Sequence, residues 1–247
     1  MTTADAAQIP YPRRRFIRFI LRTLIRGSLK ALCDLKVEGR ENMPAEGPLI
    51  LVGNHFSFLD PVAMIGLSPW TLEFVGGTHM PNAPQYLTWI TRVYGVLPVR
   101  RGGLSREALL AAQGILEQKG VLGIFPEAGS WATVLRPSRP GTALLASRTR
   151  ARILPIGFDG LLDVFPKFRR GERARVTLRI GKPFGPFFVS ARGTADRRQL
   201  DEIGHEIMRR IAELIPPERR GHYSEDPAVR EAARGTEIYP WANFIES

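Results

Sequence analysis

The sequence has a single cysteine, Cys33, among 247 residues, so no internal disulfide can form. We therefore expect a cytosol-facing protein, because thiols stay reduced there. Cys33 lies in an apolar helical pattern without a nearby histidine, which predicts a packing role rather than catalysis. The histidines are also few, and the four of them, at 55, 79, 205 and 222, show no ligand spacing. The sequence therefore predicts no metal site.

Long uncharged runs are missing from the N-terminal region. Between Arg18 and Lys30 no more than three uncharged residues occur in a row. A transmembrane helix needs about 20 predominantly apolar residues, so this stretch predicts neither a membrane span nor a secretory signal core. No linker rich in proline, glycine and serine divides the middle of the chain. A hydrophobic content of 44% is enough for one full core.

Acidic residues are outnumbered, and the formal net charge is +11. Residues 1–40 hold seven Arg and two Lys against three acidic residues. Five basic side chains recur every four residues, with Phe, Ile and Leu between them: Arg14, Arg18, Arg22, Arg26 and Lys30. This pattern predicts a basic amphipathic helix. We expect residues 1–34 to form a segment that associates with an anionic membrane surface.

Two other interpretations of this basic segment were weighed. Nucleic acid is not the predicted partner, because the basic residues alternate with large aliphatic groups and no nucleic-acid-binding motif occurs. An ordinary solvated helix face packed on the domain remains the alternative. The predicted location is the cytoplasmic face of a membrane, with a peripheral or monotopic attachment.

Apolar runs that resemble buried strands alternate with helical patterns along the chain. The strand-like runs are at 49–52, 72–75, 96–99, 121–125, 152–157 and 175–180. The helical patterns lie near 60–67, 84–94, 105–119, 139–149 and 195–215. This alternation predicts an α/β sandwich with a largely parallel sheet. We expect one domain over residues 35–216, followed by a tail over 217–247.

His55 and Asp60 are the first candidates for chemistry. His55 follows the run 49–52 and a Gly-Asn pair, which predicts a position just past a strand end, where α/β enzymes keep their reactive groups. A neutral imidazole accepts a proton near pH 7, and a carboxylate such as Asp60 can fix its tautomer. Ser57 and Asp60 also have the spacing of a helix-capping box. A simple helix start, with His55 in a structural role, is therefore the alternative.

Four blocks, in this order, resemble the glycerolipid acyltransferases typified by 1-acylglycerol-3-phosphate acyltransferase. Asn54-His55 with Asp60 is similar to the family's H-x4-D motif. The blocks 95–101, 124–130 and 153–156 are similar to its second, third and final motifs. Together the blocks extend the resemblance over roughly residues 35–185.

The resemblance implies a membrane-peripheral O-acyltransferase that moves a fatty acyl group from acyl-CoA or acyl-carrier protein to a lysophospholipid hydroxyl. It implies that His55 is the general base, that Asp60 orients it, and that no covalent acyl-enzyme forms. No cofactor beyond the acyl donor is expected. We expect backbone amides near the motif to hold the oxyanion. The expected substrate-binding residues are Asn54, Arg100, Arg101, Glu127, Gly129, Arg136 and Arg139.

The third block departs from the family pattern. The family's Gly-Thr-Arg-Ser is replaced by residues 128–131, Ala-Gly-Ser-Trp, so the arginine that would contact the acceptor phosphate is missing. Arg100 and Arg101 suit a phosphate because each guanidinium offers a fork of donors. Arg136 and Arg139 are further candidates from the following loop. Two alternatives stay open: an acyltransferase for a lipid acceptor without a phosphate, and a membrane-binding module without turnover.

Overall fold

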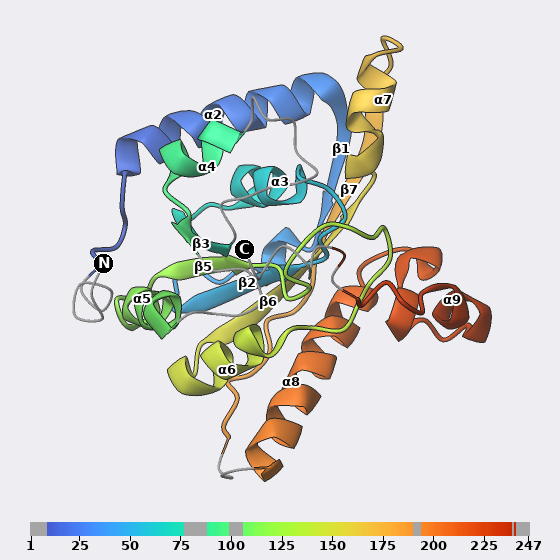
Figure 1. Ribbon diagram of the computed structural model, residues 1–247. Helices are drawn as coiled ribbons and strands as arrows, with labels where there is room; N and C mark the ends of the chain where they lie inside the picture. Colours follow the sequence, from blue (N-terminus) through green and yellow to red (C-terminus); the bar gives the residue numbers. More distant parts are fainter. Residues whose placement is uncertain (1–8, 77–87, 99–105, 190–193, 239, 241–247) are drawn as a thin grey trace.

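A computed structural model describes residues 9–76, 88–98, 106–189, 194–238 and 240 (Figure 1). Its helices are α2 (Arg15–Leu32), α3 (Asp60–Leu67), α4 (Thr88–Tyr94), α5 (Arg106–Glu117), α6 (Pro140–Thr149), α7 (Val164–Phe168), α8 (Thr194–Ala212) and α9 (Pro227–Ala232). Its strands are β1 (Cys33–Glu38), β2 (Leu49–Gly53), β3 (Leu72–Gly76), β4 (Leu97–Pro98), β5 (Val121–Ile124), β6 (Arg152–Asp159) and β7 (Ala174–Ile180). Among these helices, none combines the length and the apolar character that crossing a membrane requires.

The described strands form one seven-stranded sheet in the order β1-β7-β6-β2-β5-β3-β4. β2 lies between β5 and β6 and runs parallel to both. Only β6 and β7 pair in opposite directions, and β1 runs parallel to β7. The predicted α/β sandwich with a largely parallel sheet is confirmed.

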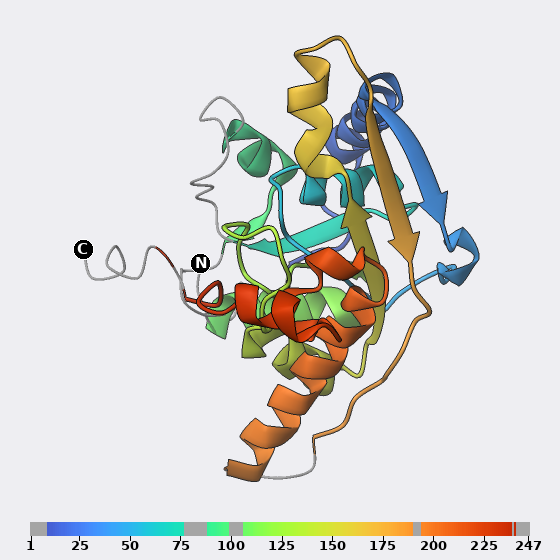
Figure 2. The same cartoon turned by 90° about the vertical axis from the view of Figure 1, so that its right-hand side faces the viewer.

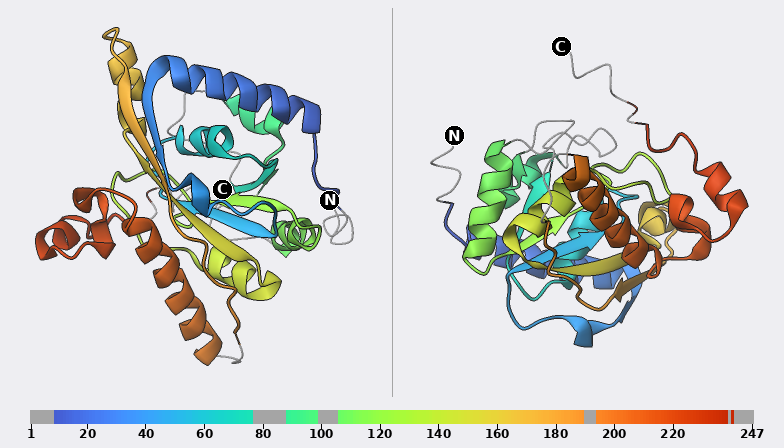
Figure 3. Two further views of the ribbon diagram at one scale, coloured as in Figure 1. Left: turned by 180° about the vertical axis from the view of Figure 1, so that it is seen from behind. Right: turned by 90° about the horizontal axis from the view of Figure 1, so that it is seen from below.

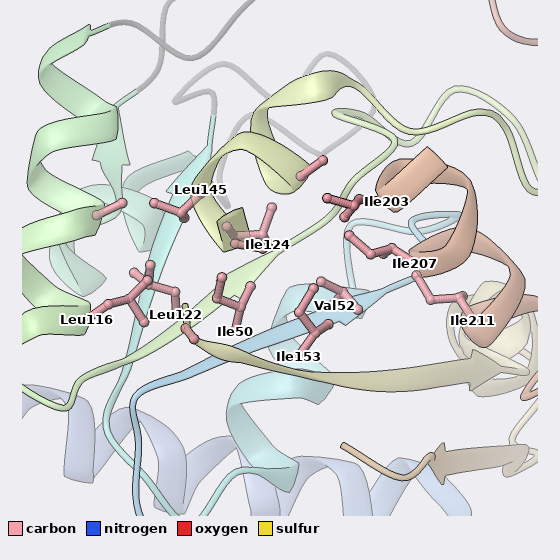
Figure 4. Close-up of a cluster of buried hydrophobic side chains, with 14 of the residues drawn as sticks. Ile50, Val52, Leu116, Leu122, Ile124, Leu145, Ile153, Ile203, Ile207 and Ile211 are labelled. Atoms are coloured by element: carbon pink, nitrogen blue, oxygen red, sulfur yellow. The ribbon is translucent and has the colours of Figure 1, made fainter. Parts of the chain in front are cut away.

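Helices cover both faces of this sheet. α5, α6 and α8 pack on one face, and α2 and α3 pack on the other (Figure 1). β2 is buried on both sides because its residues alternate between the two layers. Ile50 and Val52 face α6 and α8 (Figure 4), whereas Leu49 and Leu51 belong to the opposite cluster. The segment that follows β2, which carries His55, therefore leaves from the centre of the sheet.

The predicted boundaries agree with the structure for most elements. The helix expected over 105–119 ends at Glu117, and Lys119 then adopts a left-handed φ of 57°. Gly120 closes the turn by donating to Ile115 O at 2.9 Å, and a Cβ at Gly120 would lie 2.5 Å from that oxygen. Only glycine fits such a contact without moving the backbone. Parts of the predicted elements at 84–94 and 96–99 lie outside the described residues.

Three elements were not predicted: β1, α7 and α9. Cys33 was placed in a helical pattern, but it is the first residue of β1, where it pairs with Ala174 of β7. Its side chain is fully buried, so the predicted packing role is confirmed. β1 follows α2 directly, and it adds the edge strand beside β7. Residues 15–38 are therefore built into the sheet and its covering layer, and the separate segment expected over 1–34 does not end at a domain boundary.

Several basic side chains of α2 and of the residues before it donate hydrogen bonds to the protein body, whereas Arg15 and Lys30 are exposed. Arg18 is buried and binds the carboxylate of Glu73 on β3, with 2.8 Å between Nη2 and Oε2. Arg13 binds the same carboxylate through Nε at 3.2 Å. Three more arginines donate to carbonyl groups at the ends of α3 and α4: Arg14 to Arg92 O and Val93 O, Arg22 to Pro69 O, and Arg26 to Gly66 O and Ser68 O.

These contacts have an electrostatic reason. The carbonyls at a helix C-terminus carry a partial negative charge and attract cations. The arginines of the stripe therefore bind the protein body, while Arg14, Arg26 and Lys30 stay exposed, and association with an anionic membrane surface remains a prediction. The opposite side of α2 is apolar and exposed, with exposed fractions of 75% for Phe16, 58% for Phe19 and 61% for Leu24.

Candidate active site

The candidate site lies where β2 and β5 end. Because these strands are adjacent and parallel, the loops that follow them meet at the same edge of the sheet. The loop after β2 carries His55 and leads into α3 at Asp60. The loop after β5 carries Glu127. The sheet thus brings together two of the sequence blocks, which are about 70 residues apart.

His55 and Asp60 form the pair that the sequence predicts. The Nδ1 atom of His55 lies 3.1 Å from Oδ2 of Asp60. An ionised carboxylate only accepts hydrogen bonds, so the proton of a neutral imidazole lies on Nδ1 and Nε2 keeps its lone pair. The ring stacks on Phe125 with 4.3 Å between centroids, and its side chain is 17% exposed. A fixed tautomer in a partly exposed ring is compatible with a general base.

Asp60 also organises the turn that carries His55. Its Oδ2 accepts from the backbone N–H groups of Phe56 and Ser57, both at 2.7 Å. Ser57 Oγ in turn accepts from Leu59 N at 3.2 Å. The helix-start interpretation and the catalytic interpretation are therefore compatible, because one carboxylate orders the turn and binds the imidazole. Asp60 is 1% exposed, so its side chain is held in place by its surroundings. Its contact with Nδ1 therefore also fixes the orientation of the His55 ring.

Asn54 lies beside the site but faces the sheet. Its Nδ2 donates to Phe158 O at 3.0 Å, and its Oδ1 accepts from Phe158 N at 2.8 Å. The side chain is fully buried and continues the pairing between β2 and β6. Both of its polar groups are thus bonded to the backbone of Phe158. The structure places Asn54 as a support for the loop, not at a surface where it would contact a substrate.

Glu127 and Arg136 are brought together and buried. Glu127 Oε1 accepts from the backbone N–H of His55 at 2.8 Å. Its Oε2 accepts from both the backbone N and Nε of Arg136, each at 3.1 Å. Both residues are 1% exposed. The two predicted acceptor-binding residues are therefore bonded to each other and to the catalytic loop.

Burial shapes the ionisation of both carboxylates. It raises the pKa of Glu127 to about 7, although Arg136 and the backbone N–H groups of His55 and Arg136 act in the opposite direction. Burial also raises the pKa of Asp60 above its usual range, against the lowering effect of His55 and two backbone N–H groups. The charge of Glu127 at neutral pH thus depends on the cation beside it.

Three of the backbone N–H groups near the motif, which were expected to hold the oxyanion, already donate hydrogen bonds to carboxylates. The backbone N–H of His55 donates to Glu127, and those of Phe56 and Ser57 donate to Asp60. An N–H group bonded to a buried carboxylate is not free to stabilise a tetrahedral intermediate. The expectation that amides near the motif hold the oxyanion is therefore wrong for these three groups.

The remaining predicted residues lie at different places. Arg100 and Arg101 lie outside the described residues. Gly129 offers its carbonyl oxygen to Arg136 Nη2, and a Cβ at this position would lie 2.4 Å from the Trp131 ring. Arg139 is exposed at the start of α6, and its backbone N donates to Pro126 O at 2.8 Å. Of the two arginines predicted in this loop, only Arg139 presents its side chain to solvent.

The sequence did not predict the role of Trp131 in the site. Its ring covers the Arg136 guanidinium, with Cζ 3.7 Å from the ring centroid. Its Nε1 donates to Thr236 O at 2.8 Å, in the segment after α9. The sequence signal was the tryptophan that follows the altered third block, but nothing local indicated that it would lie over an arginine five residues later.

Comparisons with known proteins identify the family and the fold. A family model described as acyltransferase matches residues 34–159, slightly more than half of the chain. The 1-acyl-sn-glycerol-3-phosphate acyltransferase of Bacillus subtilis (strain 168) is 21% identical over 161 residues, which cover 63% of this chain and 78% of that protein. The crystal structure of the 1-acyl-sn-glycerophosphate (LPA) acyltransferase PlsC from Thermotoga maritima is similar in fold, with a TM-score of 0.53 and 20% identity over 83% of this chain and 85% of that one.

Proposed function

The chain belongs to the acyltransferase family, and we propose that it transfers a fatty acyl group from a thioester to the hydroxyl of a lysophospholipid such as 1-acylglycerol-3-phosphate. The observation that carries this proposal is the His55–Asp60 pair at the end of β2, with Nδ1 on the carboxylate and a side chain that is 17% exposed. The similarity to the Bacillus subtilis enzyme supports the choice of acceptor. The donor is acyl-CoA or acyl-carrier protein.

The proposed reaction needs no acyl-enzyme. Nε2 of His55 removes the acceptor's hydroxyl proton as its oxygen attacks the thioester carbonyl carbon. The tetrahedral intermediate then collapses, the carbon–sulfur bond breaks, and the imidazolium returns the proton to the departing thiolate. Asp60 stabilises the imidazolium and holds the ring in place. A direct transfer is chemically reasonable because a thioester already has a good leaving group.

A neutral acceptor is the second candidate, and the burial of Arg136 favours it. In the structure this guanidinium is bonded to Glu127 and Gly129 and covered by Trp131. It therefore adds no accessible positive charge to the loop that follows β5. If the acceptor carries a phosphate, its charge is expected to be balanced by Arg101 and by the exposed Arg139.

The acceptor is identified by direct assay with purified protein. We expect mass spectrometry to detect acylated product from an acyl-CoA pool and lysophosphatidate. We further expect Arg101→Ala and Arg139→Ala each to raise the KM for lysophosphatidate about tenfold or more, as for a lost charge-assisted bond of about 1.5 to 3 kcal/mol. The KM for the donor should change little.

The same assay with a monoacylglycerol separates the alternatives. A preference for monoacylglycerol, or a KM indifferent to both arginines, would replace the phosphate acceptor by a neutral lipid. Absence of product with every lysolipid and both kinds of donor would instead favour a membrane-binding module without turnover.

The enzyme is proposed to reach its lipid substrates by inserting the exposed face of α2 into a membrane surface. This face presents Phe16, Phe19, Ile20 and Leu24. Aromatic and aliphatic side chains on one side of a surface helix are typical of interfacial attachment. α2 lies along one end of the molecule, and α8 extends from the opposite end (Figure 3). Because Arg18, Arg22 and Arg26 donate hydrogen bonds within the protein, we expect insertion of apolar groups to provide most of the attachment.

We expect substitution of Phe16, Phe19 and Leu24 by Ser to weaken binding to lipid vesicles about tenfold or more, because each buried side chain contributes roughly 1.5 to 3 kcal/mol. The matched control is Phe188→Ser, which removes a side chain that is 63% exposed near α8. Vesicle flotation at low and high salt measures both effects.

High salt is expected to leave binding of the intact protein nearly unchanged, because apolar insertion is not screened. A strong loss of binding in high salt, or equal binding by the triple variant, would contradict insertion. The α2 residues are substituted rather than deleted because removal of the helix would leave Glu73 buried without Arg18.

A further inference from the structure

We propose that Arg136 is a positioning residue of the active site, which holds Glu127 against the backbone of His55 instead of binding the acceptor. This inference rests on the proposed function for its kinetic readouts. It concerns the loop of residues 125–139, which leaves β5, turns at Ala128 and returns to the site at Arg136. Its consequence is that the orientation of the catalytic histidine depends on a cation that never touches the substrate.

The first step is the connection from Arg136 to His55. One oxygen of Glu127 accepts from His55 N, and the other accepts twice from Arg136. The His55 ring is held separately, by Asp60 on one edge and by Phe125 on one face. Glu127 thus fixes the backbone of the histidine while Asp60 fixes its ring. A displacement of Glu127 would move the Cα from which the imidazole extends.

The second step is that Arg136 is enclosed. Its guanidinium lies under the Trp131 ring and donates to Gly129 O. Its Nη1 atom is buried and has no acceptor among the described residues. For this arginine to reach a phosphate, Trp131 would have to move and Glu127 would be left as an unpaired buried carboxylate. Both costs favour a fixed cation over a ligand-binding one.

The third step is that the C-terminal segment holds the loop in this shape. Trp131 donates to Thr236 O, and the loop backbone pairs with η4 (Pro217–Arg219) and η5 (Gly221–Tyr223). Leu135 N donates to Arg219 O at 2.9 Å, and His222 N donates to Leu135 O at 3.1 Å. Figure 2 shows this red segment against the yellow-green loop. The expected tail over 217–247 is, in its described part, a support for the site.

The charges around Glu127 give the proposal a measurable signature. The groups that act on it are Arg136, which favours its charged form, Asp60, which opposes it, and the bonded N–H of His55. Tyr223 also lies close enough for Glu127 to raise the pKa of its hydroxyl. The pKa of Glu127 is about 7 with Arg136 in place. Loss of the cation removes the strongest lowering influence, so the pKa of Glu127 is expected to rise and its neutral form to be favoured further.

The experiment compares Arg136→Met with the wild type over a range of pH, using the acceptor that the wild type prefers and a second lysolipid. We expect kcat to fall about tenfold or more, with KM for either acceptor within about twofold. We also expect the acid limb of the kcat profile to move to higher pH, and Arg136→Lys to recover part of the activity. The matched control is Arg219→Met. This substitution removes a 3.2 Å hydrogen bond to Thr133 O in the same loop and does not affect a contact of Glu127. We expect it to leave the pH profile of kcat unchanged.

Two further measurements keep the test decisive. In a Glu127→Gln background, Arg136→Met should have a much smaller effect on kcat, because Arg136 acts through Glu127. The ring resonances of His55, observed by NMR without substrate, should shift in Arg136→Met and not in Arg219→Met. This readout does not need turnover, so it separates the inference from the proposed function.

Three outcomes would overturn the inference. A rise in KM confined to a phosphorylated acceptor, with kcat and its pH profile unchanged, would assign Arg136 to phosphate binding. An equal effect of Arg136→Met in the wild-type and Glu127→Gln backgrounds would show that the two residues act independently. An unshifted His55 ring would show that Arg136 does not position it.

Discussion

His55→Ala is expected to reduce acyl transfer about 10²- to 10⁴-fold, the usual contribution of a positioned general base. The reason is the geometry of the pair: Nδ1 is held by Asp60, which leaves Nε2 as the proton acceptor. Folding should be preserved, because Asp60 keeps its bonds to the backbone N–H groups of Phe56 and Ser57. Product formation by mass spectrometry and the circular dichroism spectrum measure the two effects.

A second histidine provides the control for this substitution. His205 is exposed on α8 and contacts the Tyr223 hydroxyl at 3.0 Å, so His205→Ala should retain most of the activity. Asp60→Asn should resemble His55→Ala, because an amide at this position favours the tautomer with the proton on Nε2. Retention of more than about a tenth of the wild-type kcat by His55→Ala would exclude the general-base mechanism.

Glu73→Ala is expected to lower the free energy of unfolding by about 3 to 5 kcal/mol, which is the typical effect of removing one partner of a buried ion pair. Glu73 is fully buried and binds both Arg13 and Arg18. Arg18 is 3% exposed, and its side chain has one other hydrogen bond, from Nε to Tyr94 O at 3.0 Å. Without Glu73 its charge would be left buried and largely uncompensated, and α2 should loosen from the body. Urea unfolding gives the free energy, and limited proteolysis reports on α2.

Two further variants serve as controls for the Glu73→Ala measurement. Glu46→Ala removes an exposed carboxylate 3.8 Å from Lys119 and should change stability by less than about 1 kcal/mol. Glu73→Leu combined with Arg18→Met removes both buried charges and should recover much of the loss. If Glu73→Ala were no more destabilising than Glu46→Ala, the arginines of α2 would not be what holds it to β3, and the argument against electrostatic lipid binding would lose its basis.

The architecture and the contact between His55 and Asp60 could both be predicted from the sequence alone. Apolar runs flanked by turn residues identified β2, β3, β5 and β6, because strands buried on both faces need continuous apolar side chains. β7 was also identified, although its buried residues alternate with more exposed polar ones. His55 and Asp60 are five residues apart, so the local turn alone brings them together. β1 escaped prediction because its sequence, Cys-Asp-Leu-Lys-Val-Glu, alternates as an exposed edge strand does and follows a long helix directly.

Only the tertiary structure decided which face of α2 is buried and what Arg136 does. The periodicity of α2 separates a basic side from an apolar side, and exposed basic groups are the usual arrangement. Glu73, more than fifty residues away, buries Arg18, and the carbonyl ends of α3 and α4 bind three more arginines of the stripe. Arg136 likewise looked like a ligand for phosphate until Glu127 and Trp131 were seen to enclose it. The partners of the α2 arginines lie on other elements of the fold. The partners of Arg136 lie in its own loop, but the segment after α8 holds that loop in shape, through bonds such as Trp131 Nε1 to Thr236 O.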